Sequence, residues 1–585
     1  MLVYGDAERR EGCREMIGHI RNLLNAAELA HGIQAHGLLV GALIEAGALA
    51  QGIADHAFAA AGHVDARIPE AEAAMALTVA LARRVGRSWS DAMAEPDLAE
   101  TEAVQAALSA LDAMPLPFRV QVKQPEGFAY YALYPEAYWE VASTLSPDAL
   151  IVGIRSIGTT LAAIVAAAVN AAALPVTLRP LGHPFARQIS AMPDLAREAQ
   201  TATSYAVVDE GPGLSGSSFT SVARFLEDNG ASLDGIHLLP SHPGHPGPEA
   251  GDEVRRIWDA APRHVLTFDE VVLGAAEPAH RLENWVADLI GRPEGPLTEI
   301  SGGEWRRHRF ASESEWPPVH AWQERRKFLV KTQSGVWLVK FAGLGRAGME
   351  SYERARALSD AGFTPRPAGW RHGFLIERWH GEAPCPDLAQ IDREVLIARL
   401  GAYLGFRVRA FPAEPGLGAS TETLFAMARQ NSLEALGEAA ASRLDCWRPL
   451  LDRLEARRNP VRTDNRLHSW EWLVESGRLL KTDALDHHAG HDLVGAQDAT
   501  WDVVGAAYEF GLSQLETERL MSVVERESRS RLDPELTAFL RPCYLAFQLG
   551  YYTLAAAAGD VAERARLQMR INRYANLLAT ELASS

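Results

Sequence analysis

The pattern of hydrophobic and polar positions changes twice along the chain. Over residues 11–113, alanine and leucine recur at helical spacing, which predicts an α-helical N-terminal region. From residue 114, beginning with the strand-like "FRVQV", apolar runs alternate with helical stretches, and this alternation predicts an α/β domain with a mostly parallel sheet. From residue 293 the pattern predicts a β-hairpin, a helix, further strands and then mainly helices, an α+β arrangement. We therefore expect a multidomain chain divided into residues 1–113, 114–292 and 293–585.

Composition and charge narrow the class of protein. The chain has 585 residues, more than one core accommodates, and a formal net charge of −18 argues against bulk affinity for nucleic acid or an anionic membrane. The four cysteines are scattered without a C-x-x-C pair, so neither a disulfide framework nor a zinc site is expected and a reducing cytoplasm fits best. The charged first residues predict no signal peptide, and the apolar run "TTLAAIVAAAVNAAALPV" is interpreted as a buried helix. A cytoplasmic protein follows, and a homo-oligomer is compatible with it.

The stretch "YAVVDEGPGLSGSSF" contains the spacing G-x-G-x-x-G between Gly211 and Gly216. A dinucleotide-binding fingerprint needs a strand that runs straight into the glycines and an acid at the end of the next strand. Here Asp209 and Glu210 precede the glycines, where two carboxylates would repel a pyrophosphate, and the next strand ends without an acid. The dinucleotide interpretation is therefore rejected, while a capped strand–turn–helix without a ligand stays an alternative.

Two acids at the end of a strand, followed by a loop of glycine and serine, suit a sugar phosphate. Asp209 and Glu210 can accept hydrogen bonds from ribose hydroxyls, and the loop amides can hold a phosphate at the positive end of the next helix. Glycine allows the backbone to approach the ligand closely. The residues expected to hold the phosphate are Gly211, Gly213, Leu214, Ser215, Gly216, Ser217 and Ser218.

The segment "AVVDEGPGLSGSS" resembles the phosphoribosyl-pyrophosphate (PRPP) motif of type I phosphoribosyltransferases, over about residues 118–242. This resemblance implies Mg²⁺-dependent displacement at the anomeric carbon of PRPP, with Asp209 and Glu210 as catalytic residues and Asp209 also near the metal. It implies that pyrophosphate is held by Arg155, Ser156 and Gly158 and covered by Arg187 of a flexible loop over residues 179–187. The sequence departs from the family in having Glu210 in place of the commoner aspartate and a loop that is one residue longer.

The last third of the chain carries a second resemblance. Lys340 lies on the second strand of the predicted hairpin, and Glu350 and Glu353 lie on the next helix; such a lysine–glutamate pair orients ATP phosphates in kinase-like folds. The segment "DNRLHSWEWLVESGRLLKTDALDHHAGHDLVGAQDATWDVVGAA" resembles the core of aminoglycoside phosphotransferase and choline kinase-like proteins. The resemblance covers about residues 297–585 and implies ATP as the nucleotide and a metal ion at Asp483.

Two positions depart from that family's pattern. Arg466 stands where the catalytic-base aspartate is expected, and arginine does not act as a base at neutral pH. Glu471 stands at the metal-binding asparagine, so that Glu471 and Asp483 could hold a divalent metal through two carboxylates. Asp464 could replace the base if the loop is re-registered. The nearby histidines 487, 488 and 491 leave metal ligation open, whereas His36 in the helical region is interpreted as a satisfied or exposed histidine.

The combined prediction is Mg²⁺-dependent phosphoribosyl transfer or phosphorolysis, with PRPP or a ribose 5-phosphate nucleotide and an unidentified small-molecule acceptor. The kinase-like domain is predicted to be degenerate or to have an altered catalytic loop. Two alternatives stay open: a regulatory protein that senses nucleotides or PRPP, and a bifunctional phosphoribosyltransferase–kinase that also uses ATP. An open pocket above Gly211–Ser218 would favour an enzyme, and a plugged one would favour a sensor. The aromatic residues of "PEGFAYYALYP" are interpreted as packing rather than base stacking.

Overall fold

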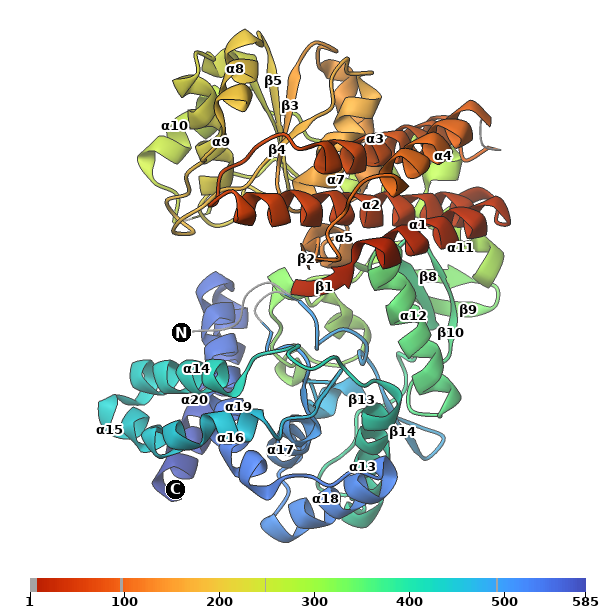
Figure 1. The fold of residues 1–585 in the computed structure, drawn as a ribbon. Helices are drawn as coiled ribbons and strands as arrows, with labels where there is room; N and C mark the ends of the chain where they lie inside the picture. The colour runs from red at the N-terminus through yellow and green to blue at the C-terminus, as the bar shows by residue number, and fades with distance from the viewer. Residues whose placement is uncertain (1–7, 95–97, 248, 491–492, 585) are drawn as a thin grey trace.

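The computed structural model describes residues 8–94, 98–247, 249–490 and 493–584. The N-terminal part is helical, as its apolar spacing predicts, and its long helices lie side by side across the middle of the molecule (Figure 1). Their bounds are α1 Cys13–Glu28, α2 Gly32–Ala60, α3 Pro69–Ser90 and α4 Leu98–Asp112. The strand-like stretch after residue 117 forms β2 (Arg119–Lys123), which pairs antiparallel with β1 (Glu8–Gly12) and does not join the parallel sheet.

Helix α2 is the central helix of the upper half of the molecule. By length and composition it could cross a membrane. In its most apolar 18-residue stretch, however, 89% of the residues are buried inside the protein. It packs against α1, α3 and α7 (Ile157–Ala168). Gly47 permits the close approach to α7, because a Cβ atom at this position would lie only 1.9 Å from Oγ1 of Thr160. A core helix therefore accounts for the apolar composition of α2.

The predicted parallel sheet forms between residues 150 and 239. Its strand order is β4-β3-β5-β6, and each neighbouring pair is parallel. Helix α7 is fully buried over Ile157–Ala167 and packs toward α2 and α3, whereas α8, α9 and α10 belong to the core on the other side of the sheet. The bounds are β3 Leu150–Ile154, β4 Val176–Leu178, α8 Pro193–Thr201, β5 Tyr205–Val208, α9 Ser217–Asp228, β6 Ile236–Leu239 and α10 Asp252–Ala260. The predicted elements of this segment are thus present.

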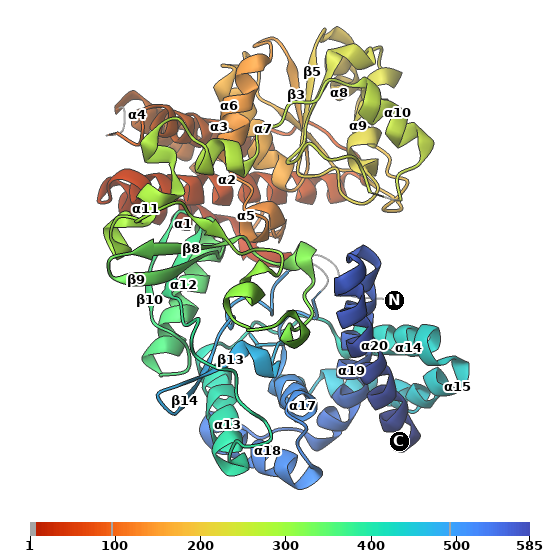
Figure 2. The ribbon, with the colours of Figure 1, turned by 180° about the vertical axis from the view of Figure 1, so that it is seen from behind.

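Two short helices precede this sheet, and one follows it. Both α5 (Glu126–Tyr130) and α6 (Pro135–Val141) are largely buried, and α11 (Leu282–Ile290) packs on β10. In Figures 1 and 2, α5 lies between the parallel sheet and the lower half of the molecule. This position makes α5 a bridge between the two regions that carry the predicted motifs.

The predicted hairpin belongs to an antiparallel sheet with strand order β10-β11-β9-β8-β7. Its strands β8 and β9 turn at residues 333–334, as predicted, and α12 packs on β10 and β11. The bounds are β7 Thr298–Glu299, β8 Lys327–Thr332, β9 Gly335–Phe341, α12 Gly345–Asp360, β10 Pro367–Arg371 and β11 Phe374–Arg378. A sheet with one helix, followed by a helical part, is the α+β arrangement expected from the pattern.

The remainder is mainly helical, with short strand pairs β12–β15 and β13–β14. The helices are α13 Arg393–Ala410, α14 Thr421–Leu436, α15 Glu438–Ala441, α16 Leu451–Glu455, α17 Ala499–Glu509, α18 Gln514–Ser528, α19 Pro534–Ala558 and α20 Val561–Ser584. The strands are β12 Pro460–Val461, β13 Trp472–Glu475, β14 Arg478–Lys481 and β15 Gln497–Asp498.

One hydrophobic core runs across the predicted domain boundaries. It contains Leu43 of α2, Leu161 of α7 and Phe341 of β9, so the helical region, the α/β segment and the antiparallel sheet share buried surface. One separate core lies within the C-terminal helices, and another lies between these helices, α12 and β11. The boundaries at residues 113 and 292 stay predictions, but the regions that they separate pack against one another.

Candidate functional site

The C-terminal segment predicted to be kinase-like brings a lysine and an aspartate together in one pocket. Lys340 on β9 forms an ion pair with Asp483, which follows β14 with a left-handed backbone (φ 51°) that aspartate tolerates better than most residues. Burial by itself would lower the pKa of Lys340, but Asp483 and Asp486 outweigh burial and raise it. Burial would raise the pKa of Asp483, but Lys340 and His487 hold it well below its usual range. Both groups are therefore ionised at neutral pH.

The pocket around this pair is small and strongly charged. Its cavity volume is about 70 Å³, which suits water molecules or an ion, whereas nucleotide-sized ligands occupy pockets of roughly 300 Å³ or more. Side chains must therefore move before a nucleotide can enter. The ionisable residues in its wall are Glu324, Arg325, Lys327, Lys340, Arg466, His468, Asp483, Asp486 and His487.

Tyrosines from outside the kinase-like segment also line the pocket. Tyr130 and Tyr131 come from the end of α5, and the guanidinium of Arg325 lies 4.2 Å from the ring centre of Tyr130. Arg325 also pairs with Asp486 at 2.9 Å. These tyrosines were interpreted from the sequence as packing residues; Tyr130 is buried, Tyr131 is exposed, and both border the pocket.

The residues near Asp483 differ from the predicted metal pair. Asp483, Asp486 and His487 offer ligand atoms that all lie within 4.8 Å of one another. Glu471 instead accepts a hydrogen bond of 2.9 Å from the fully buried Lys481 and lies outside the pocket lining. The pairing of Glu471 with Asp483 was wrong because the partner of Glu471, Lys481, lies on the antiparallel strand β14 and no local pattern reveals it.

Asp464 does not lie where it could act as the base that the resemblance implies. It is buried, accepts a hydrogen bond from Tyr403, and lies 3.6 Å from Nζ of Lys481 and 3.7 Å from Nδ1 of His487. Burial would raise its pKa, but these cations hold the pKa far below its usual range. Because Asp464 is absent from the pocket lining, its carboxylate serves internal ion pairs. Arg466 lines the pocket in the region where the base was expected.

The predicted pairing of Lys340 with the following helix also differs from the structure. Glu353 is exposed on α12, and Glu350 binds Arg462 at 2.7 Å and Arg346 at 3.1 Å. Lys340 is neutralised by Asp483 instead. His487 lies 3.5 Å from Asp483, and its pKa is raised because the two neighbouring aspartates outweigh burial. His488 is buried with a lowered pKa, and His491 lies outside the described residues.

The predicted ribose-phosphate motif lies at the point of the parallel sheet where the chain stops adding strands on one side and starts adding them on the other. The chain continues from β3 to β4 on one side and then to β5 on the other, and ligands of such sheets bind at the carboxyl ends of the two strands that flank this point. Asp209 and Glu210 follow β5, and Arg155, Ser156 and Gly158 follow β3. The two predicted loops are therefore neighbours.

The glycine loop has the backbone that a close approach requires. Gly211, Gly213 and Gly216 have positive φ values of 132°, 64° and 63°, and Gly216 is the N-cap of α9. Asp209 lies against the amides of Glu210 and Gly158, and burial raises its pKa well above the usual value. Glu210 accepts a hydrogen bond of 3.0 Å from the amide of Gly127 on α5.

The hydroxyl groups of the loop contact the predicted flexible loop. Ser215 and Ser217 both donate to the carbonyl of Pro184, at 3.0 and 2.5 Å, while Leu214 is exposed and Ser218 is half-buried. Arg187 donates at 3.5 Å to the carbonyl of Pro180 in the same loop. Residues 179–187 thus contact the glycine loop through Pro184, and their predicted role in covering pyrophosphate stays a prediction.

Arg155 does not face this crevice as predicted. It is buried and forms ion pairs with Asp65 and, at 3.1 Å, with Asp55, and it donates to the carbonyl of Thr177 at 2.9 Å. Both acids come from the helical region, on α2 and the loop that follows it. The structure gives no support to the expectation that Arg155 holds pyrophosphate, because its guanidinium nitrogens are all used within the protein.

Comparison with solved structures finds similarity over about half of the chain, with TM-scores near 0.3. No family model matches this chain, and no curated protein matches it. It is similar to the choline kinase LicA from Streptococcus pneumoniae (16% identity, 43% of this chain, 89% of that chain, TM-score 0.31) and to a choline/ethanolamine kinase family protein from Mesorhizobium loti (16%, 53%, 95%, 0.31). It is also similar to a glucosamine kinase in complex with glucosamine, ADP and inorganic phosphate (16%, 53%, 84%, 0.31).

Proposed function

We propose that the pocket around Lys340 and Asp483 binds the phosphates of a nucleotide and transfers a phosphoryl group to a small-molecule acceptor. The observation that carries the proposal is the Lys340–Asp483 ion pair, enclosed in a pocket with Arg325, Lys327 and Arg466 in its wall. A lysine on a strand and an aspartate opposite it are the groups that orient phosphates and their metal in kinase-like sites.

The acids of the pocket fit Mg²⁺. Asp483 and Asp486 supply the carboxylate oxygens that this ion prefers, and His487 lies beside them. Bound there, Mg²⁺ would neutralise phosphate charge. Lys340, released from Asp483, would then contact a phosphate oxygen, so that each member of the present ion pair receives a new partner of opposite charge.

Because Arg466 stands where the resemblance implies a catalytic base, we expect a low rate of phosphoryl transfer. Phosphoryl transfer depends mainly on positioning and on stabilisation of charge, and Arg466, Arg325 and Lys340 provide that charge. A general base contributes about 10²–10⁴-fold to a rate. We therefore expect a slow phosphotransferase whose acceptor hydroxyl loses its proton to water.

A nucleotide that enters the pocket would also affect the predicted ribose-phosphate motif, because α5 contacts both sites. Tyr130 and Tyr131 border the pocket at one end of α5, and Gly127 at the other end donates to Glu210. A Cβ atom on Gly127 would lie 2.9 Å from the carboxylate of Glu210, so this contact leaves little room. Displacement of the tyrosines would therefore disturb the ribose-phosphate motif.

The proposal is tested with the purified full chain. Calorimetric titration with ATP and ADP in the presence of Mg²⁺ measures binding, and release of ADP in the presence of hydroxyl- and amine-bearing acceptors measures transfer. We expect nucleotide binding that requires Mg²⁺ and acceptor-dependent ADP release. Absence of binding at millimolar nucleotide would refute the proposal, and binding without turnover would reduce it to a nucleotide sensor.

Glu377 makes nucleotide binding depend on pH. It lies on β11 near Lys340, and burial raises its pKa to about 7. Below pH 7 the group is neutral, whereas above pH 7 its carboxylate competes with phosphate for Lys340. Relative to Glu377→Gln, the wild type should therefore lose affinity several-fold between pH 6 and pH 8. Titration at several pH values measures this difference, with the exposed Glu353→Gln as control; parallel profiles for wild type and Glu377→Gln would contradict it.

A second candidate function rests on the glycine loop after β5. The switch-point position of Asp209 and Glu210 and the positive-φ glycines support binding of PRPP or another ribose 5-phosphate ligand. Because Arg155 is used by internal ion pairs, binding is better supported than phosphoribosyl transfer. The chain would then combine a site that senses a ribose 5-phosphate ligand with a site that transfers a phosphoryl group.

The test of this site is a double substitution of its acids. Wild type should bind PRPP with Mg²⁺ at micromolar affinity. Asp209→Asn/Glu210→Gln should weaken binding at least tenfold, because the carboxylate of Glu210 loses its charge and the carboxyl group of Asp209 loses an oxygen acceptor. Calorimetry gives the affinity, and pyrophosphate release reports turnover. The matched control is Glu227→Gln/Asp228→Asn, an acidic pair at the far end of α9. Equal affinity of wild type and the site variant would remove this candidate.

A further inference from the structure

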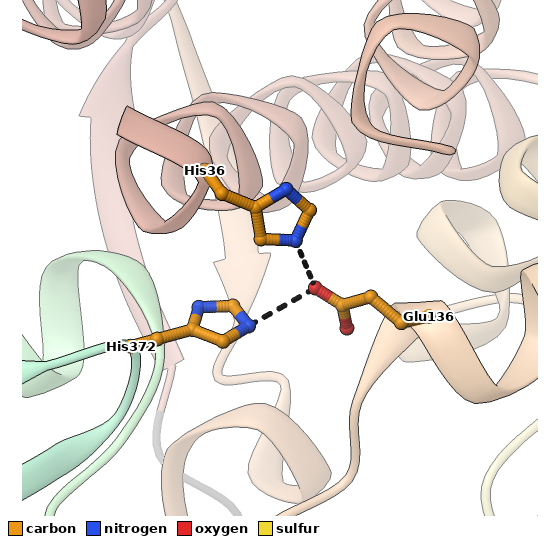
Figure 3. Close-up of side chains that lie close together, drawn as sticks. All are labelled: His36, Glu136 and His372. Carbon is orange, nitrogen blue, oxygen red and sulfur yellow. Dashed lines mark hydrogen bonds and ion pairs between the residues drawn. The ribbon is translucent and has the colours of Figure 1, made fainter. Parts of the chain in front are cut away.

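Three ionisable side chains meet in the interior, away from both motifs. His36 comes from α2, Glu136 from α6 and His372 from the turn between β10 and β11 (Figure 3). Nε2 of His36 lies 2.8 Å and Nε2 of His372 lies 3.0 Å from Oε1 of Glu136. All three side chains are completely shielded from solvent. We call these residues the junction triad.

The junction triad leaves polar atoms without partners. Oε2 of Glu136 and Nδ1 of His372 are buried and have no hydrogen-bond partner. Over the described parts of the chain, the only ion-pair partners of Glu136 are the two imidazoles, with no arginine or lysine. A buried carboxylate oxygen without a partner is costly, so this arrangement suits a further positively charged partner.

The surroundings orient both imidazoles. Oγ of Ser88 lies 3.0 Å from Nδ1 of His36, so the hydroxyl could accept a proton on Nδ1 once a metal ion replaced the Nε2 proton that now faces Glu136. His372 has a left-handed backbone (φ 39°), and the hydroxyl of Tyr134 donates to its carbonyl at 2.7 Å. His372 and Gly373 (φ 96°) form the two-residue turn of the β10–β11 hairpin, which needs positive φ at both positions and so fixes where His372 lies.

We propose that the junction triad is a binding site for a zinc-class divalent ion, with His36 and His372 as nitrogen ligands and Glu136 as the carboxylate ligand. Two imidazoles and a carboxylate are donors that Zn²⁺ accepts, and the fourth position of a tetrahedral ion would be filled by Oε2 of Glu136 or by a water molecule. The ligand atoms lie within 4.8 Å of one another. Ligands of one tetrahedral zinc lie about 3.3 Å apart, given bonds of about 2.0–2.1 Å. Small side-chain movements therefore convert the hydrogen-bonded triad into a metal site.

The site would join three parts of the fold. Its ligands come from the helical region, from the segment before the parallel sheet and from the antiparallel sheet of the kinase-like segment. The rings of Trp89, Trp285 and Tyr134 pack around the imidazoles and keep the site apolar. Because metal binding to such a buried site adds to folding free energy, the ion would stabilise the packing of these parts. The inference does not depend on nucleotide binding.

The test measures metal in the full chain purified from cells grown with added zinc. We expect one zinc per chain by mass spectrometry of the metal content, and less than a tenth of this in His36→Asn and in His372→Asn. The control is His280→Asn. His280 is a neighbouring buried histidine that stacks on Trp89 outside the junction triad, so this variant should contain as much zinc as wild type. Asp483→Asn should also keep it, which separates this site from the kinase-like pocket. Equal zinc in wild type and both ligand variants, or a wild type without zinc, would overturn the proposal.

A second measurement covers the case in which the ligand variants fail to fold. Wild type from cobalt-supplemented cells should show the visible absorption of four- or five-coordinate Co²⁺ without the charge-transfer bands of thiolate ligands, because no cysteine belongs to the junction triad. Removal of the metal after unfolding in chelator, followed by refolding without metal, should lower the melting temperature, and zinc should restore it. Absence of the cobalt bands, or a melting temperature that zinc does not change, contradicts the site.

Discussion

Substitution of Lys340 by methionine is expected to weaken binding of a Mg²⁺-nucleotide at least 100-fold. Methionine keeps much of the apolar stem of lysine but removes the ammonium that pairs with Asp483 and, in the proposed complex, with phosphate. A 100-fold loss corresponds to about 2.7 kcal/mol, within the range of hydrogen bonds that involve charged partners. Calorimetric titration of ATP with Mg²⁺ into the full chain measures the effect.

A lysine on the neighbouring strand provides the matched control. Lys331 on β8 is highly exposed and forms only a loose ion pair of 3.9 Å with Glu294, so Lys331→Met should bind nucleotide like wild type. Melting temperatures of both variants separate loss of binding from loss of folding. If Lys340→Met retained affinity within threefold of wild type, the pocket would not be the nucleotide site.

A double-substitution cycle with Asp483 tests the exchange of partners. Asp483→Asn should remove the Mg²⁺ requirement together with most of the affinity, because Asp483 is the expected ligand of the ion. The double variant Lys340→Met/Asp483→Asn should lose less than the sum of both single losses, since the two residues contact each other in the unliganded protein and act on one ligand. Additive losses would show that the residues act independently.

The features that could be predicted from the sequence are those formed by residues that lie next to one another in the chain. The strand, acids and glycines of residues 205–219 follow one another directly, and the structure has β5, the positive-φ loop and α9 in that order. The turn of the β8–β9 hairpin is equally local. The pairing of Lys340 with Asp483 was not predicted, because the resemblance paired Lys340 with Glu350 and Glu353 and 143 residues separate Lys340 from Asp483.

Other features depend on contacts that no local pattern records. Glu350 and Glu353 lie on one helix, and only packing decides that Glu350 meets Arg462 while Glu353 stays exposed. The junction triad joins residues that are 100 and 236 positions apart, so the helical pattern around His36 gave no sign of it. Arg155 likewise depends on acids of the helical region, which was treated as separate from the α/β segment.

The contacts of Arg155 lead to the largest stability prediction. Arg155→Met should destabilise the α/β segment by about 3–5 kcal/mol, because Asp65 is left buried without its guanidinium partner. For a cooperative unit of 150–250 residues this corresponds to a fall in melting temperature of about 6–20 °C. Differential scanning calorimetry of the full chain measures the shift in melting temperature. If the chain melts in several steps, hydrogen exchange of the β3 and β4 amides reports the stability of this segment separately.

Two further variants decide whether the cost comes from the buried charge. Arg155→Met/Asp65→Asn should recover much of the lost stability, since the neutral amide needs no cation, although Asp55 keeps Arg179 as a partner in every variant. Arg224→Met removes an arginine from a surface pair with Glu253 in the same segment and should cost less than about 1 kcal/mol. If Arg155→Met were as stable as Arg224→Met, Arg155 would not be required to neutralise Asp65. Its guanidinium would then be available to a ligand at the carboxyl end of β3, and the phosphoribosyltransferase interpretation of this crevice would regain its pyrophosphate-binding residue.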